Sequence, residues 1–549
     1  MPPRGSGAVG WRASGNTASP LQLPATGPVP TLRPPLMRPS FLTSALLLLA
    51  SCSATTESHP PPSTRFVYPS GLEFWRPAGS LSPSTNGYLF VASANFDSCF
   101  DSGAVMAVNL DAIGKGEGKP LPTLDPAHPF SGSPLEITEL NVPSEAYVQI
   151  DSFAGEMASW SNPGNGGLPR LFVPSRAKNN FLHAIDFKLD GSTGSLACAQ
   201  SGAGRDCSQN ALSLSSDIPH SEADLPRAPS PIGVTVDPAS GAVYVTHSEA
   251  ADSPARTSKN FASYLVSVPA DKPVRDSLEF ILLSRDGLTY GGTDATAVGD
   301  GYLYVTGRNY VQGSSGTVGA SFILRLVDKY DHAHVIEPNV FSQVRISEAR
   351  GAQVVRAPVD PAAPLVRKER LYMLARGPDT LLVFDFEYKL PDPALGEQRP
   401  STPTFRIVST VPLPGGTSEL RLVRRSKDSV GDNIIAVTST TDGALSLYDE
   451  KLGQVVAQVA LGTGLNQNTN PTQSFGLAVD NPDGELAAGA AGRLNAARIF
   501  VTNFGAGQVT VVDIPELNRP QDARLVARIG TRQERDLRQG TSVCEENNP

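Results

Sequence analysis

The 549-residue chain is poor in charge, in histidine and in long apolar runs. Charged residues make up 18 % of it and hydrophobic residues 40 %, a balance that predicts a folded core and argues against a disordered chain. The formal net charge is -9 and no basic stripe is present, so nucleic acid is not an expected partner. The 50 glycines and 48 prolines are instead typical of many short strands joined by turns.

Motifs for known chemistry are also missing. The sequence contains no Cys-x-x-Cys-His, no G-x-S-x-G and no P-loop. His332 and His334 could share one side of a strand and suit a metal, but they follow "DKYD", which predicts a solvated turn. The acidic stretches Asn95–Gly103 and Asp480–Glu485 lack the oxygen spacing of an EF-hand loop. We therefore expect no catalytic residue, no cofactor and no metal site.

An export signal lies in "MRPSFLTSALLLLASCSATT", Met37–Thr56. Arg38 supplies a positive n-region, and the apolar run Phe41–Ala50 is about half the roughly 20 residues that a membrane-spanning helix needs. The run ends in "LASC", which resembles the lipobox of bacterial lipoproteins. That resemblance implies cleavage before Cys52 and a lipid on its sulfur. The alternative is an ordinary signal peptide with an incidental cysteine.

The segments on either side of this signal differ from it in composition. Residues 1–36 are rich in Pro, Gly and Ser and hold no acid, so translation starts at Met37 or the segment is a disordered extension. Residues 1–51 are therefore predicted to be extension plus signal peptide, and residues 52–65 a lipidated flexible tether. The expected location is the bacterial cell envelope. Ser53 follows the cysteine, and by resemblance to enterobacterial sorting this suggests the outer membrane, facing the periplasm or the cell surface.

A two-strand phrase recurs along the chain and is clearest in "RIFVTNFGAGQVTVVDIP". Each copy has a β-branched and aromatic run, a polar or glycine turn and a second such run, which predicts a hairpin. The copies span Gly87–Leu110, Arg170–Phe187, Gly241–Ala250 with Ser263–Ala270, Gly301–Tyr310 with Ser321–Asp328, Arg370–Phe386, Asn433–Glu450 and Arg498–Pro515. Flanking apolar runs extend each copy to about four antiparallel strands, and several such sheets packed radially would bury both faces.

The phrase resembles the YVTN β-propeller repeat, through "FVTNFGAGQVTVVDIP" and the Tyr-Val-Thr sequences at residues 244–246 and 304–306. The resemblance implies an all-β, seven-bladed β-propeller of four-stranded antiparallel blades over residues 66–530, followed by a polar tail, residues 531–549. The copies are spaced more widely than compact blades, so long loop insertions are expected at Asp111–Leu140, Asp190–Arg227 and Pro391–Pro403. The alternative is a pair of β-sandwiches.

In such propellers the innermost strands line the channel, so the loops that enter them ring its mouth. We predict the ligand face there. The candidates, each just ahead of or within a presumed inner strand, are Glu156, Arg227, Asp294, Arg350, Glu419 and Gln473. The alternative for any one of them is a solvated loop charge.

Four further cysteines form an even set in an exported chain, which permits disulfides with three possible pairings. Cys198 and Cys207 bracket a flexible glycine loop, and we predict a bridge between them. Ring closure would put the first and last blades side by side, within reach of the tail. We therefore predict a second bridge, Cys99–Cys544, across this seam; the alternative is that both stay free.

Three classes of function remain. The first is a non-catalytic binding or scaffolding lipoprotein, since a rigid ring with long loops suits binding. Its partners would be the membrane, through the lipid, and another envelope protein or a surface ligand. The alternatives are a propeller enzyme of lactonase or quinoprotein type that uses the central channel, and a structural component of an envelope assembly. Fold analogy alone does not decide among them.

Overall fold

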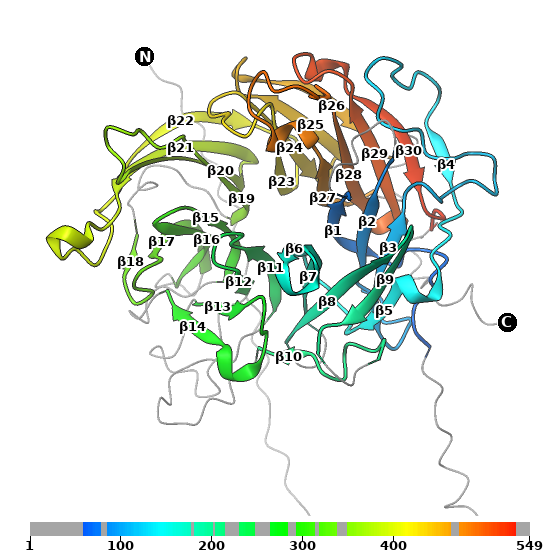
Figure 1. Ribbon diagram of the computed structural model, residues 1–549, viewed down its shortest axis with the longest axis horizontal. Coiled ribbons are helices and arrows are strands. Elements are labelled where there is room, and N and C mark those ends of the chain that lie inside the picture. The colour runs from blue at the N-terminus through cyan, green and yellow to red at the C-terminus, as the bar shows by residue number, and fades with distance from the viewer. Residues whose placement is uncertain are drawn as a thin grey trace, which may run out of the picture. The chain divides into compact units, whose positions relative to one another are not determined.

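Seven sheets are arranged side by side around a common centre in the computed structural model (Figure 1). All described residues belong to the compact unit Ser58–Pro549. The structure describes residues 59–77, 85–176, 180–200, 204–214, 230–247, 264–283, 292–312, 318–337, 348–462 and 472–533. Within these ranges no helix has the length and hydropathy needed to cross a membrane.

The first four sheets follow one another along the chain. The first contains β1 (Pro69–Trp75), β2 (Tyr88–Ser93), β3 (Gly103–Asn109) and β5 (Tyr147–Ile150). The second contains β6 (Ala158–Asn162), β7 (Leu168–Ser175), β8 (Phe181–Asp190), β9 (Thr193–Cys198) and β10 (Leu212–Ser213). The third contains β11 (Pro231–Val236), β12 (Ala242–His247), β13 (Tyr264–Pro269) and β14 (Glu279–Leu282). The fourth contains β15 (Thr293–Val298), β16 (Tyr302–Gln312), β17 (Val318–Asp328) and β18 (Val335–Ile336).

The last three sheets complete the ring. The fifth contains β19 (Glu348–Arg356), β20 (Val366–Arg376), β21 (Thr380–Lys389) and β22 (Thr404–Pro412). The sixth contains β23 (Thr417–Arg424), β24 (Asn433–Ser439), β25 (Ala444–Asp449) and β26 (Gln454–Ala460). The seventh contains β27 (Ser474–Asp480), β28 (Ala497–Asn503), β29 (Gln508–Ile514), β30 (Arg524–Ile529) and β4 (Leu135–Ile137). Short 3-10 helices are η2 (Ser144–Ala146), η3 (Pro163–Asn165), η4 (Arg275–Ser277), η5 (Pro393–Leu395), η6 (Pro482–Glu485), η7 (Phe504–Ala506) and η8 (Pro520–Asp522).

The predicted all-β, seven-bladed propeller is confirmed, and all seven predicted hairpins form the two middle strands of a blade. Two of the expected loop insertions differ from the prediction because they contain strands. The stretch Asp111–Leu140 includes β4, and Asp190–Arg227 includes β9 and β10; Pro391–Pro403 includes only η5. His59 and Pro61, within the predicted tether, hydrogen-bond to Asp101 and Tyr147 of the first blade.

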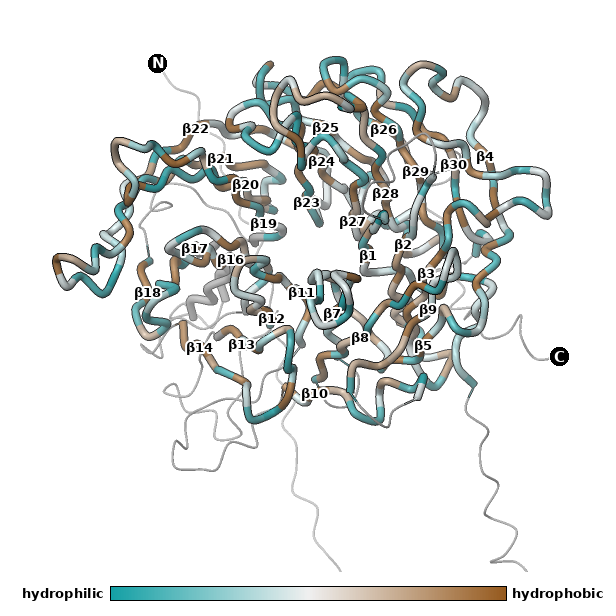
Figure 2. Tube along the Cα trace, in the orientation of Figure 1, coloured by the Kyte–Doolittle hydropathy of each residue, from teal (hydrophilic) through white to brown (hydrophobic). Residues whose placement is uncertain are grey.

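The hydrophobic core lies between neighbouring blades. One cluster combines Ile434 and Leu445 of the sixth blade with Leu477 and Ile499 of the seventh, all fully buried. Figure 2 shows this pattern as hydrophobic colour along the strands and hydrophilic colour in many of the connecting loops. Strands buried on both faces need near-continuous apolar runs, which is why the middle strands read as "IFV" or "LYV".

A threonine hydroxyl closes a bulge in several inner strands. Every inner strand holds one extra residue against its partner strand near the end where the chain enters. Thr246 Oγ1 accepts a hydrogen bond from Gly233 N at 3.0 Å and donates one to the Asp294 carbonyl of the next blade, also at 3.0 Å. Thr438 repeats both bonds at 3.1 and 2.9 Å, and Thr306 and Thr502 repeat the first at 3.1 and 2.7 Å. The Thr of the repeated phrase therefore joins strand to strand and, at two positions, blade to blade.

Several copies of the two-strand phrase begin with an Arg and have an Asp near the end of the second strand. These two residues form a second contact that recurs from blade to blade. Arg498 donates to both carboxylate oxygens of Asp513, at 2.6 and 2.9 Å, and to Asn86 of the first blade at 2.9 Å. Arg498 is 1 % exposed, so this charged pair is effectively removed from water and linked across the seam of the ring.

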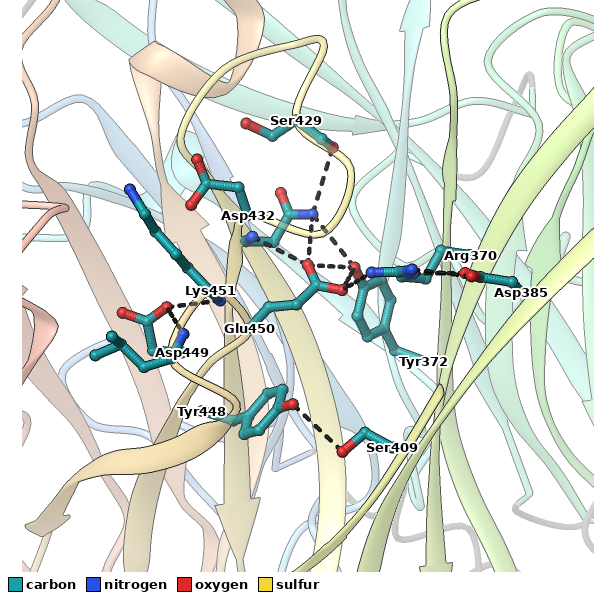
Figure 3. Close-up of polar contacts among 12 residues, drawn as sticks. Arg370, Tyr372, Asp385, Ser409, Ser429, Asp432, Tyr448, Asp449, Glu450 and Lys451 are labelled. Atoms are coloured by element: carbon teal, nitrogen blue, oxygen red, sulfur yellow. Dashed lines mark hydrogen bonds and ion pairs between the residues drawn. The ribbon is translucent and has the colours of Figure 1, made fainter. Parts of the chain in front are cut away.

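The fifth and sixth blades are joined by the same device (Figure 3). Arg370 pairs with Asp385 of its own blade at 2.6 Å and with Glu450 of the sixth blade at 2.7 Å. Tyr372 donates to the same Glu450 carboxylate at 2.8 Å. Arg170 pairs likewise with Asp186 and then with backbone carbonyls of the third blade.

A strand from the first blade pairs with the last blade and so closes the ring. β4 leaves the first blade between β3 and β5 and pairs in parallel with β30 of the seventh blade. Gly530 N donates to the Ile137 carbonyl at 2.8 Å, and Arg528 pairs with Glu136 at 2.8 Å. Ile137 is fully buried against the apolar cluster that the two blades share. Figure 1 shows β4 beside β30 at the rim.

We expect Thr246→Val to lower the free energy of unfolding by about 1–3 kcal/mol, because the isosteric side chain leaves a buried N–H and a buried carbonyl without their partner. Urea unfolding followed by tryptophan fluorescence measures this. Thr404→Val, which removes an exposed hydroxyl from β22, is the matched control and should change stability by less than about 0.5 kcal/mol. Equal losses in the two variants would show that the hydroxyl bridge is not what stabilises the blade junction.

Candidate functional site

The structure brings four of the six predicted site residues to the centre of the ring. Asp294, Arg350 and Glu419 lie in the inner strands β15, β19 and β23, and Glu156 lies two residues before the inner strand β6. Gln473 immediately precedes β27 and lines a pocket at the mouth of the ring. Arg227 lies outside the described residues. That these residues bind a ligand stays a prediction.

Two residues that the sequence analysis did not select complete this group, which we call the charged centre: Glu73, Glu156, Asp294, Arg350, Glu419 and Arg421. Arg421 Nη2 lies 2.8 Å from Glu419 Oε1 and 3.8 Å from Glu73 Oε1, so it links the sixth blade to the first. Aligning the inner strands by their bulges would have found Glu73 and Arg421, because they occupy the same position of β1 and β23.

Further contacts fix the other charges. Arg350 Nη1 lies 3.6 Å from Asp294 Oδ1, joining the fifth blade to the fourth. Leu477 N donates to Glu419 Oε2 at 2.8 Å, and Ser159 donates to Glu73 Oε2 at 3.0 Å. Each arginine of the charged centre is thus held by a carboxylate, and residues from five blades meet around the axis.

Three carboxyl groups of the charged centre, those of Glu73, Glu156 and Glu419, bind protons more tightly than exposed ones. Burial raises the pKa of Glu73 to about 7, although Arg421 and the Ser159 hydroxyl oppose the shift. Burial, together with the nearby Glu419 carboxylate, raises the pKa of Glu156 to about 8. Burial also raises the pKa of Glu419, against the pull of Arg421. Glu156 is therefore mostly protonated at neutral pH.

A cavity of about 480 Å³, which we call the mouth pocket, opens at the end of the ring where the inner strands begin. Its walls include the rings of Tyr68, Phe96, Phe475 and Phe504. The Tyr68 and Phe504 ring centres lie 5.0 Å apart, and those of Phe96 and Phe504 lie 5.7 Å apart. The remaining walls are formed by Ser70, Ala94, Ala154, Gly155, Arg176, Ile232, Thr440, Gln473 and Gly505. Phe96 is 48 % exposed, so part of this aromatic wall faces water.

The backbone entering the pocket is strained. Tyr68, Phe153 and Gln473 each immediately precede the first paired residue of an inner strand and have φ values of 54°, 61° and 48°. Left-handed backbone is costly for a bulky side chain, by roughly 1–2 kcal/mol. Ser230, at the same position of the third blade, has a φ of 54° and does not line the pocket, so the left-handed residue is a repeated feature of the entry to the inner strands. At Tyr68 and Gln473 the side chain of this residue also forms part of the pocket wall. The sequence gives no local signal for such a conformation at an aromatic residue.

Ser175, His183 and Asp151 lie close together like a catalytic triad, but their role is structural. His183 Nε2 lies 3.0 Å from Ser175 Oγ and 3.4 Å from Asp151 Oδ2. In a triad the acid sits on the other ring nitrogen and the hydroxyl is accessible, whereas Ser175 is fully buried. Burial lowers the pKa of His183 to about 4, so the imidazole is a neutral, buried side chain of the second blade.

No metal-binding cluster of three or more His, Cys, Asp or Glu side chains occurs in the described ranges. His332 and His334 lie in a turn, as predicted, and contact Glu279 and Asp328 respectively.

The cysteines agree with the prediction where the structure describes them. Cys198 and Cys207 form the predicted disulfide. Cys99 is also disulfide-bonded, but Cys544 lies outside the described residues, so the Cys99–Cys544 pairing stays a prediction. Cys52 lies outside the described residues as well, and its lipidation stays a prediction.

Comparisons with known proteins give only weak likenesses. No protein-family model and no curated protein matches the chain. Apo AztD from Citrobacter koseri is 10 % identical, with a TM-score of 0.32 over 81 % of this chain and 83 % of its own. Dihydro-heme d1 dehydrogenase NirN in complex with DHE is 10 % identical, with a TM-score of 0.34 over 84 % and 78 %. Sqt1 from Chaetomium thermophilum is 11 % identical, with a TM-score of 0.34 over 86 % and 90 %. Likenesses this weak carry no argument about activity.

We expect Glu156→Gln to change how stability depends on pH. A carboxyl whose pKa is raised on folding makes the folded state bind more protons, so its contribution to stability falls as pH rises from about 4.5 to about 8. The neutral amide removes this loss. At pH 9 the variant should therefore be more stable than the parent by about 1–3 kcal/mol, and near pH 5 the difference should be much smaller.

Urea unfolding at pH 5, 7 and 9 measures the effect. Glu485→Gln, at an exposed position of η6, is the control and should follow the parent at every pH. A Glu156→Gln curve parallel to the parent curve would contradict the raised pKa.

Proposed function

We propose that this chain is an exported, lipid-anchored binding protein of the cell envelope, and that its ligand enters the mouth pocket. One observation supports this above the others: an apolar cavity of about 480 Å³, walled by aromatic rings and open at one end of a rigid ring. Cavities of this size and lining are where proteins bind small molecules. The lipobox-like sequence ending in Cys52 supports the anchor.

The backbone that enters the inner strands holds two side chains of the pocket wall in place. Tyr68 and Gln473 adopt costly conformations that line the cavity, and strain of this kind persists only where the surrounding structure enforces it. A non-catalytic role is the simpler reading of the charged centre, because each of its arginines is already held by a carboxylate. The ligand would be held by contact with the walls, as in other preformed pockets.

The anchor is tested with Cys52→Ala in a bacterial host that processes lipoproteins. We expect the parent to fractionate with membranes, and the variant to lose both the membrane association and the normal cleavage, because the acceptor sulfur is gone. Ser53→Ala keeps that sulfur and is the control. Unchanged processing and membrane partition of Cys52→Ala would overturn the lipid anchor.

The pocket is tested with Nile red, a neutral apolar dye whose fluorescence rises on burial. We expect Phe96→Ser to weaken dye binding by about tenfold or more, since burying one phenylalanine contributes roughly 1.5–3 kcal/mol. Phe405→Ser is matched to it, because Phe405 is 39 % exposed but lies on β22, away from the mouth pocket. Equal binding by the two variants would place the ligand site elsewhere.

A further inference from the structure

The mouth pocket lies directly beside the charged centre. Three residues that line the pocket, Gly155, Ile232 and Phe475, are each followed by a residue in the bulge of an inner strand. In the second blade that next residue is Glu156. A Cβ added to Gly233, which follows Ile232, would lie 3.3 Å from Glu156 Oε2. Glu156 itself does not line the pocket, but its carboxyl lies beside Gly233, the residue that follows the pocket wall at Ile232.

The charges of this centre do not balance. It holds four carboxyl groups and two arginines, and both arginines are engaged: Arg350 with Asp294, and Arg421 with Glu419 and Glu73. Among the described residues, Glu156 has no ion-pair partner within 4.0 Å. A carboxyl that is partly withdrawn from water and has no ion-pair partner favours a proton or an added cation.

The aromatic wall has the same preference. Ring faces carry partial negative charge and attract a cation within about 6 Å of their centres. Tyr68, Phe96 and Phe504 present three rings whose centres lie 5.0 to 6.0 Å from one another at the pocket wall. Neutral aliphatic walls would give the same apolar contact without this charge preference. Arg176 is the one charged residue among the described lining residues, and it already has an interaction partner of its own.

We propose that the mouth pocket selects organic cations, whose ammonium group lies toward Glu156 and whose apolar body lies against Tyr68, Phe96 and Phe504. This inference rests on the proposed function and gives the chemical class of the ligand. Quaternary or alkylated ammonium groups fit best, because they are weakly hydrated and spread their charge over methyl groups that pack against rings.

Binding of such a cation is coupled to a proton. The groups around Glu156 are Glu419 and Asp294, which raise its pKa, and Arg421 and Arg350, which lower it. Because burial keeps Glu156 protonated near neutral pH, an entering ammonium group would displace that proton. The affinity for the cation should therefore rise with pH and level off above about pH 8.

The experiment uses the full chain and three probes of similar size: benzyltrimethylammonium, its neutral isostere neopentylbenzene, and the anion benzenesulfonate. Ligand-observed NMR gives the dissociation constant of each.

We expect the cation to bind about tenfold or more tightly than the neutral probe at pH 8. Glu156→Gln should remove most of that advantage and leave the neutral probe unchanged, with Glu485→Gln as the control. The parent should also bind the cation about tenfold more tightly at pH 8 than at pH 6.

The outcomes separate the two proposals. Equal binding of cation and neutral probe, both lost in Phe96→Ser, would retain the binding function and overturn the cation preference. A cation advantage that survives in Glu156→Gln and does not vary with pH would also overturn it. If no probe binds the parent and Nile red binding does not depend on Phe96, both proposals fail. Tighter binding of the anion would reverse the assigned charge preference.

Discussion

Four of the seven bulged inner strands depend on a threonine hydroxyl from the neighbouring strand. The extra residue in the bulge leaves a backbone N–H without a ladder partner, and the hydroxyl of Thr246, Thr306, Thr438 or Thr502 accepts its hydrogen bond. At Thr246 and Thr438 the same oxygen donates to the next blade. A single side chain thus satisfies a local defect and sets how closely two inner strands approach, which explains why the repeated phrase contains threonine in an otherwise apolar strand.

Close approach of the inner strands then decides which residues can occupy the centre. A Cβ at Gly476 would lie 2.2 Å from the Ser70 carbonyl, and one at Gly155 would lie 2.2 Å from the Ile232 carbonyl, so these junctions require glycine. Where the bulge carries a larger residue, as at Glu156 and Glu419, the side chain joins the charged centre. The same constraint therefore closes the ring and places carboxyl groups below the mouth pocket.

The architecture was predictable from the sequence because it depends on a repeated local pattern, namely a β-branched and aromatic run, a turn and a second run. The positions of Glu156, Asp294, Arg350 and Glu419 followed from the same pattern, since the start of an inner strand can be counted from the hairpin. The contacts among them were not predictable, because Arg421 reaches Glu73 across the seventh blade. The strand β4 was not predictable either. Its three residues resemble a loop in the sequence, and they form a strand because β30 provides a partner. The left-handed Tyr68 has no sequence signal at all.

The pairing of β4 with β30 also has a consequence for the order of folding. β4 belongs to the first blade, yet the Glu136–Arg528 contact that accompanies its pairing spans 392 residues of chain. Contacts of such long range form late, because the loop-closure entropy must be offset by structure that already exists. Until the seventh blade has folded, Ile137 has no apolar surface of that blade to contact, and β4 has no edge to pair with. A chain that stops short of β30 therefore leaves β4 unpaired and Ile137 without the surface that buries it, so the last strand completes the folding of the first blade.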